Sequence, residues 1–540
     1  MTKGSLIRTR LAALLWASLS VLILEVMAGS ASAATFSVVS SADSGDLSPG
    51  DGKCGGSISI GGSIMLRLPC TLRAAIEEIN AQPLGTGPHT INFSIGVGDQ
   101  TISLTKALPE IKQPVLIDGG TQPVYAIDIH TPLSRTLTSC SAVKINRHPC
   151  IELNANGLST PVLTLAAGSS TMRYLAIYNY SGTVGIENSG TGVLVTSDNN
   201  LIEFSYIGIN ASGAAGSAQQ QGVAVNPPLG HTAANTVIRN SLISGNRQNG
   251  VLISGLAIHD SRVVSNFIGT TAAGSAALLS IDFQTCLNNP QLALGVFIKN
   301  GAANNVIEAN LISGNCSGVV IDASGLTAPY NDTTARRTYN QVLGNQIGTD
   351  STGASLVPNQ MYGVLINNAS NNAVASTASG TGNVISGNFY AVAIKTTNQQ
   401  IAARDNQVMN NQIGTNAAGA ELGNSHTGML LSGFLTGTAI SGNVVANNPS
   451  NGIKLSTVSL PTNPNGPQYN FLQNNTVSNN GNNGIFMESG AIGNTAQSNT
   501  ALGNGNWDLI DDNYNASSCP NTWITNTFVK AGGLGKSCIQ

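Results

Sequence analysis

The chain has 540 residues, of which 41% are hydrophobic and only 9% are charged, and its formal net charge is -3. Nucleic acids and anionic membranes attract concentrated basic patches, so this balance argues against both as the main partner. The hydrophobic content is too high for a disordered chain and is enough to build a large core.

Residues 1 to 33 have the three parts of a secretory signal. Lys3 and Arg8 precede an apolar run from Leu11 to Leu24, and the segment ends in the small residues ASA at 31 to 33. The run is shorter than the roughly 20 apolar residues that span a bilayer. We therefore expect cleavage after this segment and a mature protein that is exported to the periplasm, the cell surface or the medium, without a transmembrane segment.

Residues 34 to 80 are expected to form an N-terminal cap. In CTLRAAIEEIN, at 70 to 80, Leu72, Ala75, Ile76 and Ile79 fall on one helical face, as in an amphipathic helix that covers the open end of a repeat structure. The preceding DSGDLSPGDG, at 43 to 52, offers oxygen ligands that suit calcium, but its spacing differs from that of an EF-hand. A polar turn is the favoured interpretation, and no other cofactor is expected.

Residues 81 to 506 repeat the word Gly-apolar-x-apolar, as in GVLI at 250, GVFI at 295 and GVVI at 318. Each repeat contains three short segments with apolar residues two apart, which is the pattern of strands facing a core. Gly and Asn are poor helix residues, and a propeller blade needs about 40 to 50 residues. The pattern therefore predicts an all-β fold, a single-stranded parallel β-helix in which the strands stack coil upon coil.

Asparagines recur at one position of a second word, Asn-x-apolar-x-x-Asn-x-apolar. An inward-turned amide can bond to the turn backbone and to the asparagines of the neighbouring coils, whereas Asp would stack like charges and Ala would leave backbone groups unpaired. The predicted ladder consists of Asn240, Asn266, Asn310, Asn345, Asn411, Asn443, Asn475 and Asn499.

Four long segments leave the repeats after the word Ile-Gly, at about 209 to 221, 270 to 294, 349 to 362 and 415 to 427. Because all four start at the same place in a coil, they should line one edge of the rod. Loops on a rigid scaffold are the usual location of binding sites. Residues 507 to 540 then form a C-terminal cap.

The eight cysteines all follow the signal. An even number in an exported chain favours disulfides, and the spacing lacks the Cys-x-x-Cys pattern of zinc sites. Sequence alone leaves the connectivity open. Their order suggests four local pairs: Cys54 with Cys70, Cys140 with Cys150, Cys286 with Cys316, and Cys519 with Cys538.

The words NVISGN and IGT, with CTLRAAIEEIN and CPNTWITNTF at 519 to 528, resemble exported bacterial right-handed parallel β-helix proteins of the pectin-lyase-like superfamily. Thr71 and Ala74 differ from the Ser and the acidic residue of that family's N-terminal segment. The resemblance implies a right-handed coil and carbohydrate ligands, but such motifs specify a fold more than a reaction. YAIDIH, Tyr125 to His130, partly resembles an alginate epimerase motif but lacks its Gly and Pro.

Candidate site residues follow the repeat words on the outward face. Lys299 and Asp322 are the candidate catalytic residues, as base and charge partner, and the alternative is a surface ion pair worth about 0 to 1 kcal/mol. Phe297 is a candidate for stacking on a sugar ring, unless loops cover it. Arg336 and Arg337 are candidates for binding carboxylates, with a solvated pair as the alternative.

We predict a secreted or cell-surface rod that binds polysaccharide, or another surface partner, through its looped edge. The alternative is a polysaccharide-active enzyme on the same scaffold, which would be a lyase, a glycoside hydrolase or a uronate epimerase. Binding is favoured because the sequence shows no catalytic signature of these enzymes.

Overall fold

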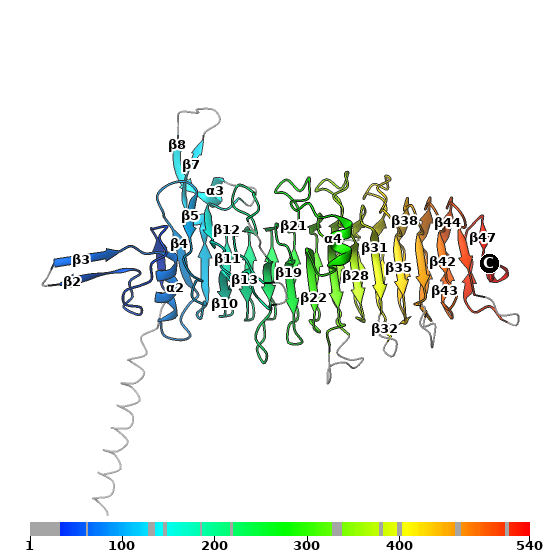
Figure 1. Ribbon diagram of the computed structural model, residues 1–540, viewed down its shortest axis with the longest axis horizontal. Helices are drawn as coiled ribbons and strands as arrows, with labels where there is room; N and C mark the ends of the chain where they lie inside the picture. Colours follow the sequence, from blue (N-terminus) through cyan, green and yellow to red (C-terminus); the bar gives the residue numbers. More distant parts are fainter. Residues whose placement is uncertain are drawn as a thin grey trace, which may run out of the picture.

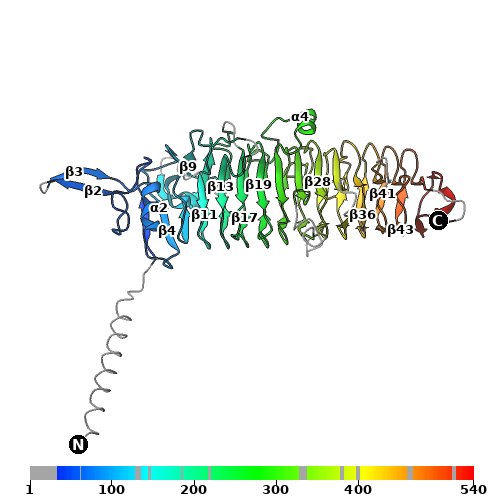
Figure 2. The same cartoon turned by 60° about the horizontal axis from the view of Figure 1, so that its bottom comes forward.

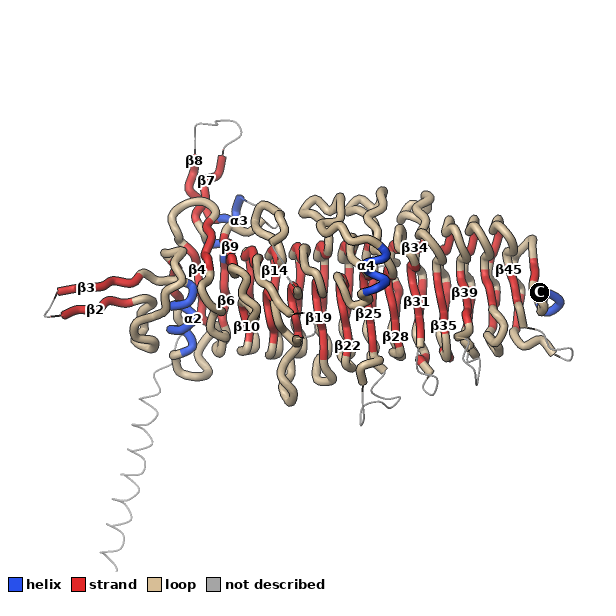
Figure 3. Tube along the Cα trace, viewed as in Figure 1, coloured by secondary structure: helices blue, strands red, loops and turns tan. Residues whose placement is uncertain are grey.

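The computed structural model describes residues 33–60, 63–127, 135–143, 148–183, 186–216, 220–326, 337–376, 382–396, 402–458, 466–513 and 518–540. The predicted signal, apart from residue 33, lies outside the described residues. Three long parallel sheets form a rod, and the chain passes through sheets 1, 2 and 3 in turn before it begins the next coil (Figures 1 and 3). This is the predicted parallel β-helix.

Sheet 1 has 15 strands. They are β1 (Thr35–Val38), β4 (His89–Phe93), β6 (Val115–Asp118), β11 (Thr171–Arg173), β14 (Leu201–Glu203), β17 (Val237–Arg239), β20 (Arg262–Val264), β23 (Val306–Glu308), β26 (Gln341–Leu343), β29 (Ala373–Ala375), β33 (Gln407–Met409), β37 (Ala439–Ser441), β40 (Phe471–Gln473), β43 (Thr495–Gln497) and β46 (Thr522–Ile524).

Sheet 2 has 13 strands. They are β5 (Gln100–Ser103), β9 (Ile151–Asn154), β12 (Leu175–Tyr178), β15 (Tyr206–Ile207), β18 (Leu242–Ile243), β21 (Phe267–Ile268), β24 (Leu311–Ile312), β27 (Gln346–Ile347), β30 (Val384–Ile385), β34 (Gln412–Ile413), β38 (Val444–Ala446), β41 (Thr476–Ser478) and β44 (Thr500–Leu502).

Sheet 3 also has 13 strands. They are β10 (Leu163–Leu165), β13 (Thr191–Val195), β16 (Gln221–Val225), β19 (Asn249–Ser254), β22 (Leu294–Lys299), β25 (Ser317–Asp322), β28 (Tyr362–Asn367), β31 (Tyr390–Lys395), β35 (Met429–Ser432), β39 (Ile453–Ser456), β42 (Ile485–Met487), β45 (Leu509–Asp511) and β47 (Ala531–Gly532).

Shorter elements lie outside these sheets. Two antiparallel hairpins project from the N-terminal part of the rod (Figure 1). The remaining strands and helices are β2 (Gly56–Ile60) with β3 (Ser63–Leu68), β7 (Pro123–Ile127) with β8 (Arg135–Ser139), β32 (Ala403–Arg404) with β36 (Leu435–Thr436), α2 (Leu72–Asn80), α3 (Cys140–Val143), α4 (Phe283–Asn288), and the 3-10 helices η1 (Gly119–Thr121) and η2 (Lys536–Cys538).

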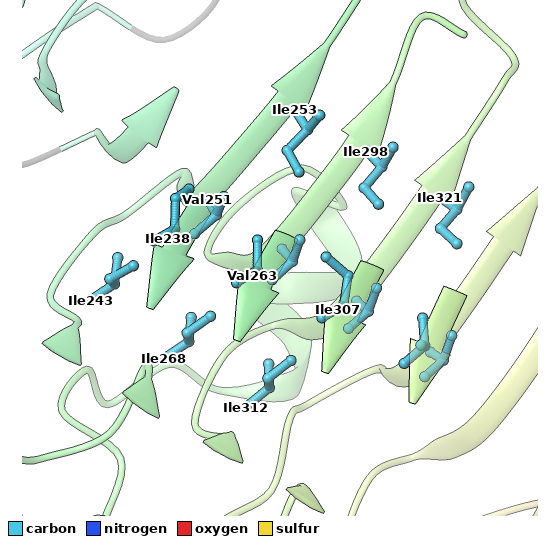
Figure 4. Close-up of a cluster of buried hydrophobic side chains, with 14 of the residues drawn as sticks. Ile238, Ile243, Val251, Ile253, Val263, Ile268, Ile298, Ile307, Ile312 and Ile321 are labelled. Atoms are coloured by element: carbon cyan, nitrogen blue, oxygen red, sulfur yellow. The ribbon is translucent and has the colours of Figure 1, made fainter. Parts of the chain in front are cut away.

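The core is a continuous column of branched aliphatic side chains. In one coil, Ile238 of sheet 1, Ile243 of sheet 2 and Val251 of sheet 3 point inward and are almost fully buried (Figure 4). The next coils repeat the arrangement, with Val263 stacked on Ile238 in register. Period-two alternation therefore places every second residue of all three sheets in one core.

The segment before α2 forms an ion pair and hydrogen bonds with the helix, besides the apolar packing that its amphipathic pattern predicts. Arg73 is 2% exposed and forms an ion pair of 2.9 Å with Asp43. Glu77 and Glu78 accept hydrogen bonds from the backbone N–H groups of residues 46, 50 and 52. Carboxylates of the DSGDLSPGDG segment and of α2 thus accept hydrogen bonds that join the segment to the helix.

Asparagine ladders run along all three corners of the rod, whereas the sequence predicts a ladder at one corner. At the corner between sheets 1 and 2, the backbone N–H of Asn266 donates to Oδ1 of Asn310 at 2.9 Å, and its Nδ2 donates to the same atom at 3.1 Å. The contact repeats from coil to coil. This ladder consists of Asn266, Asn310, Asn345, Asn383, Asn411, Asn443, Asn475, Asn499 and Asn526.

The assignment of Asn240 to this ladder is wrong. Asn240 has a positive φ of 51° and occupies the bend just before the ladder position. Ser241 takes that position instead, and its backbone N–H donates to Oδ1 of Asn266 at 3.0 Å. Asparagine suits both places, because its short polar side chain tolerates left-handed backbone and also bonds to turn groups.

The structure joins the cysteines in the order in which they occur. The four S–S bonds are Cys54 with Cys70, Cys140 with Cys150, Cys286 with Cys316, and Cys519 with Cys538. Among the residues described, no helix has the length and apolar character needed to cross a bilayer. The sheets extend into both predicted caps, since β1 begins sheet 1 and β46 ends it.

Candidate functional site

The four long segments all connect sheet 2 to sheet 3 and lie along one edge of the rod (Figure 1). Each begins with a small antiparallel turn after its Ile-Gly word. The bridged pairs are Ile209 with Ala215, Thr270 with Ala277, Thr349 with Leu356, and Thr415 with Glu421. All four segments leave the coil after sheet 2 and rejoin it at sheet 3, so their different lengths do not change the order of the strands in the sheets.

The longest of these segments, 270 to 294, carries α4 and covers part of the outer face of sheet 3 (Figure 2). Asp282 caps α4 by accepting the N–H of Thr285 at 2.6 Å. The Cys286–Cys316 disulfide joins the helix to the residue just before β25, and the ring of Phe283 lies 4.8 Å from that of Phe389. We call residues 283 to 292 the roof, because two anchors hold them over the sheet.

Two adjoining cavities of about 330 Å³ and about 200 Å³ lie between the roof and sheet 3. Gln291 of the roof and Phe297 of β22 line both, so we treat them as one feature, the sheet 3 groove. Its other lining residues are Ile186, Glu187, Gln221, Gln248, Asn249, Leu252, Lys299, Cys286, Pro290, Leu294, Cys316, Ser317, Val320, Asp322, Met361, Tyr362, Leu365 and Asn367.

The floor of the groove follows from the repeat. Leu252, Phe297, Val320 and Leu365 are neighbours in register on successive strands of sheet 3, and all four occupy the one outward place inside the repeat word. The next outward place carries polar residues. The groove therefore has an apolar floor along the rod with charged and amide side chains at its sides. Phe297 is only 5% exposed in this floor, so its neighbours cover most of its ring, which is the alternative to sugar stacking named in the sequence analysis.

Lys299 and Asp322 are adjacent in register on β22 and β25 but do not form an ion pair. No ion pair of 4.0 Å or less joins them. Nζ of Lys299 lies 5.6 Å from the ring centre of Phe297, and Oδ1 of Asp322 accepts hydrogen bonds from Asn367 at 3.1 Å and from the Ser324 N–H at 2.8 Å. The base-and-partner contact and the alternative surface ion pair are both absent between these two residues.

The same geometry shows what Lys299 and Asp322 offer a ligand. Lys299 lines the larger cavity and presents three donors, while Asp322 lines the smaller cavity and presents acceptors. Glu187 adds a further acceptor, which Asn226 already orients at 2.9 Å. Hydrogen-bonding groups thus flank the apolar floor on more than one side.

The chain is similar to several solved β-helix structures. They include the A-module of the Azotobacter vinelandii mannuronan C-5 epimerase AlgE4, at 16% identity over 77% of this chain and 92% of that one, with a TM-score of 0.44. The A-module of the mannuronan C-5 epimerase AlgE6 from the same organism is 14% identical over 79% of this chain and 94% of that one, with a TM-score of 0.43. The Dettilon tailspike protein is 15% identical over 73% of this chain and 63% of that one, with a TM-score of 0.41. No family model and no curated protein matches the chain.

The remaining predicted site residues lie away from the groove or outside the described part. Arg337 is exposed and forms a bridge with Ser370 on the connection between sheets 3 and 1. Arg336 lies outside the described residues. YAIDIH begins in the hairpin strand β7, and its last three residues, 128 to 130, also lie outside them. Within the described ranges, no group of three or more His, Cys, Asp and Glu side chains is placed to hold a metal ion.

Sequence reasoning missed several groove residues. Gln291 and Pro290 belong to the roof, whose path no repeat specifies. Tyr362 left a readable signal, because it stands directly before GVLI at 363 just as Tyr390 stands before AVAI at 391. An aromatic residue before the repeat word lies at the edge of sheet 3 that faces the loops.

Proposed function

We propose that the protein is an exported rod that binds polysaccharide in the sheet 3 groove. The observation that carries the proposal is the apolar floor of the groove, with Phe297 at its centre, beneath a roof fixed by the Cys286–Cys316 disulfide. Disulfides of this kind persist in oxidising compartments, which supports export.

A sugar ring matches such a surface in two ways. Its C–H face packs on apolar or aromatic side chains, and its hydroxyl rim exchanges hydrogen bonds with amides, carboxylates and ammonium groups. In the groove, the half-buried Tyr362 and Leu365, with the small exposed part of Phe297, would supply the packing surface. Gln291, Lys299 and Asp322 would supply the hydrogen bonds. Ligand sites in general combine a mostly apolar lining with a few polar groups.

The test measures binding and turnover together on the purified mature protein. Calorimetry with polygalacturonate, alginate, hyaluronan and dextran identifies the polymer, while reducing ends and the absorbance of unsaturated products report cleavage. The double variant Lys299→Gln/Asp322→Asn should weaken binding about tenfold or more, because each change removes a charged hydrogen-bonding partner. Arg262→Gln, on the exposed outer side of sheet 1, serves as control and should bind as the wild type does.

Failure of the wild type to bind any polymer would contradict the proposal, as would equal affinity of the double variant. Turnover of a polymer would replace it with the enzymatic alternative, a lyase, glycoside hydrolase or uronate epimerase.

A further inference from the structure

An aromatic cluster adjoins the C-terminal end of the sheet 3 groove. Tyr362 and Tyr390, neighbours in register on β28 and β31, stack with ring centres 5.6 Å apart. Phe389 lies 4.8 Å from Tyr390 at right angles and 4.7 Å from His426, on which it stacks. With Phe283 of α4 the cluster has five rings, and all five are half-buried.

The cluster is continuous with the groove through Tyr362. This residue lines the smaller cavity together with Asp322, and its other side contacts Tyr390. Lys395, the last residue of β31, donates from Nζ to the Tyr362 hydroxyl at 3.3 Å. A ligand that leaves the groove along the rod therefore meets half-buried aromatic side chains with a hydroxyl and an ammonium group beside them.

Support of the roof accounts for only part of this cluster. The contact between Phe283 and Phe389 is the one that reaches α4. Tyr362, Tyr390 and His426 lie on the sheet side, and their polar tips suit a surface that is apolar at its centre and wet at its rim. Burial, and secondarily Lys454, lowers the pKa of His426, which disfavours the charged form of its ring.

We propose that this cluster is a second sugar-binding subsite, an inference that rests on the proposed function. The cluster packs against a pyranose ring of the same polysaccharide chain that occupies the groove. The ligand then runs along the rod axis. From β22 to β31 is three coils, or about 14 Å at the usual strand spacing, so the ligand is an extended oligosaccharide segment rather than a single sugar.

Two variants of Tyr390 separate stacking from support. Tyr390→Leu keeps an apolar side chain but removes the ring, and Tyr390→Phe keeps the ring. Phe204→Leu is the matched control, because Phe204 stacks on Tyr174 at 5.2 Å on another corner of the rod. Calorimetry uses a length series of oligosaccharides prepared from whichever of polygalacturonate, alginate, hyaluronan or dextran the wild type binds.

For oligosaccharides long enough to reach from Phe297 to Tyr390, Tyr390→Leu should weaken binding about three- to tenfold, while Tyr390→Phe and Phe204→Leu should match the wild type. For shorter oligosaccharides, all four proteins should bind equally. Equal affinity of Tyr390→Leu at every length would overturn the subsite, and so would a loss that is the same at all lengths, because that is the signature of a displaced roof. A wild type that binds no polymer contradicts the proposed function itself, which distinguishes the two failures.

Discussion

The side-chain amide of Asn521 donates to both carboxylate oxygens of Asp511, each at 3.2 Å, at the C-terminal end of the rod. Asn521 is the last asparagine of the ladder between sheets 3 and 1, where Asn494 in turn donates to Asn521. In these ladders the amide of one coil donates to the next coil, so the last amide has no asparagine acceptor in a following coil. A buried carboxylate supplies it, as Asp508 does for Asn504 in the ladder between sheets 2 and 3.

Adjacent substitutions at this end should have opposite effects on stability. Asp511 also accepts from Nε1 of Trp523 at 2.9 Å and is fully buried, so Asp511→Asn should lower the free energy of unfolding by about 1 to 3 kcal/mol. The pKa of Asp512 is raised by burial and by the negative charges of Asp511 and Glu488. Its charged form is thus disfavoured in the folded protein, and Asp512→Asn should increase stability at pH 7.

Urea unfolding followed by tryptophan fluorescence measures both effects. Trp507 and Trp523 are the two tryptophans after the predicted signal, and both lie in the last coils. Unchanged or raised stability of Asp511→Asn would show that the ladder end does not depend on the Asp511 carboxylate. Lowered stability of Asp512→Asn would contradict the unfavourable charge at Asp512.

Acid should destabilise the same end of the rod. Burial of Asp508 would raise its pKa, but hydrogen bonds from Lys530, Asn504 and Val529 lower it below the ordinary value of 3.8. A carboxyl group with a lowered folded pKa contributes stability that is complete above pH 3.8 and is lost as the pH falls through the folded pKa. The midpoint temperature should therefore fall as the pH is lowered below 3.8, and less steeply in Asp508→Asn. An equal slope in both proteins would assign the acid sensitivity to other groups.

A third prediction concerns the corrected ladder position. Asn266 is fully buried, and its Nδ2 donates to the carbonyl oxygen of Ile238 at 2.8 Å, so Asn266→Ala should cost about 1 to 3 kcal/mol by leaving this group and the Ser241 N–H unpaired. Asn240→Gly should change stability by no more than about 0.5 kcal/mol, because glycine accepts the positive φ. Thermal unfolding of the two variants measures both effects. Equal losses of stability would contradict the assignment of the ladder position to residue 241 rather than to Asn240.

The strands of sheet 3 show what can be predicted from the sequence. The Gly-apolar-x-apolar words gave the strands of sheet 3 and their register, because inward residues two apart admit one core. They also predicted that Lys299 and Asp322 would be neighbours. The first ladder position is a serine, Ser241, and the residue before it is an asparagine at the bend. The repeat pattern therefore assigned Asn240 to the ladder in its place.

Other features were not predictable from the repeats. Whether Lys299 and Asp322 touch depends on side-chain rotamers and on partners such as Asn367 and Phe297. The roof lies in a loop whose length and path the coils leave free, so the groove itself could not be derived. Only its edge was predictable, from the common start of the four long segments.

The fourth prediction concerns the roof. Replacing both Cys286 and Cys316 by serine should leave the rod folded but release α4, so proteases should cut within residues 283 to 292 and polysaccharide affinity should fall. Replacing Cys140 and Cys150 instead removes a disulfide that lines neither cavity of the groove, and affinity should stay unchanged. Limited proteolysis with mass spectrometry, together with calorimetry, measures both. An intact roof after loss of the disulfide would mean that the contact between Phe283 and Phe389 suffices.

The most direct measurement is a crystal structure of the mature protein with the oligosaccharide that binds most tightly. The account predicts a sugar ring against the apolar lining of the groove, beside Gln291, with hydrogen bonds to Lys299 and Asp322. Density for the sugar elsewhere on the rod, with the groove filled by ordered water alone, would contradict it.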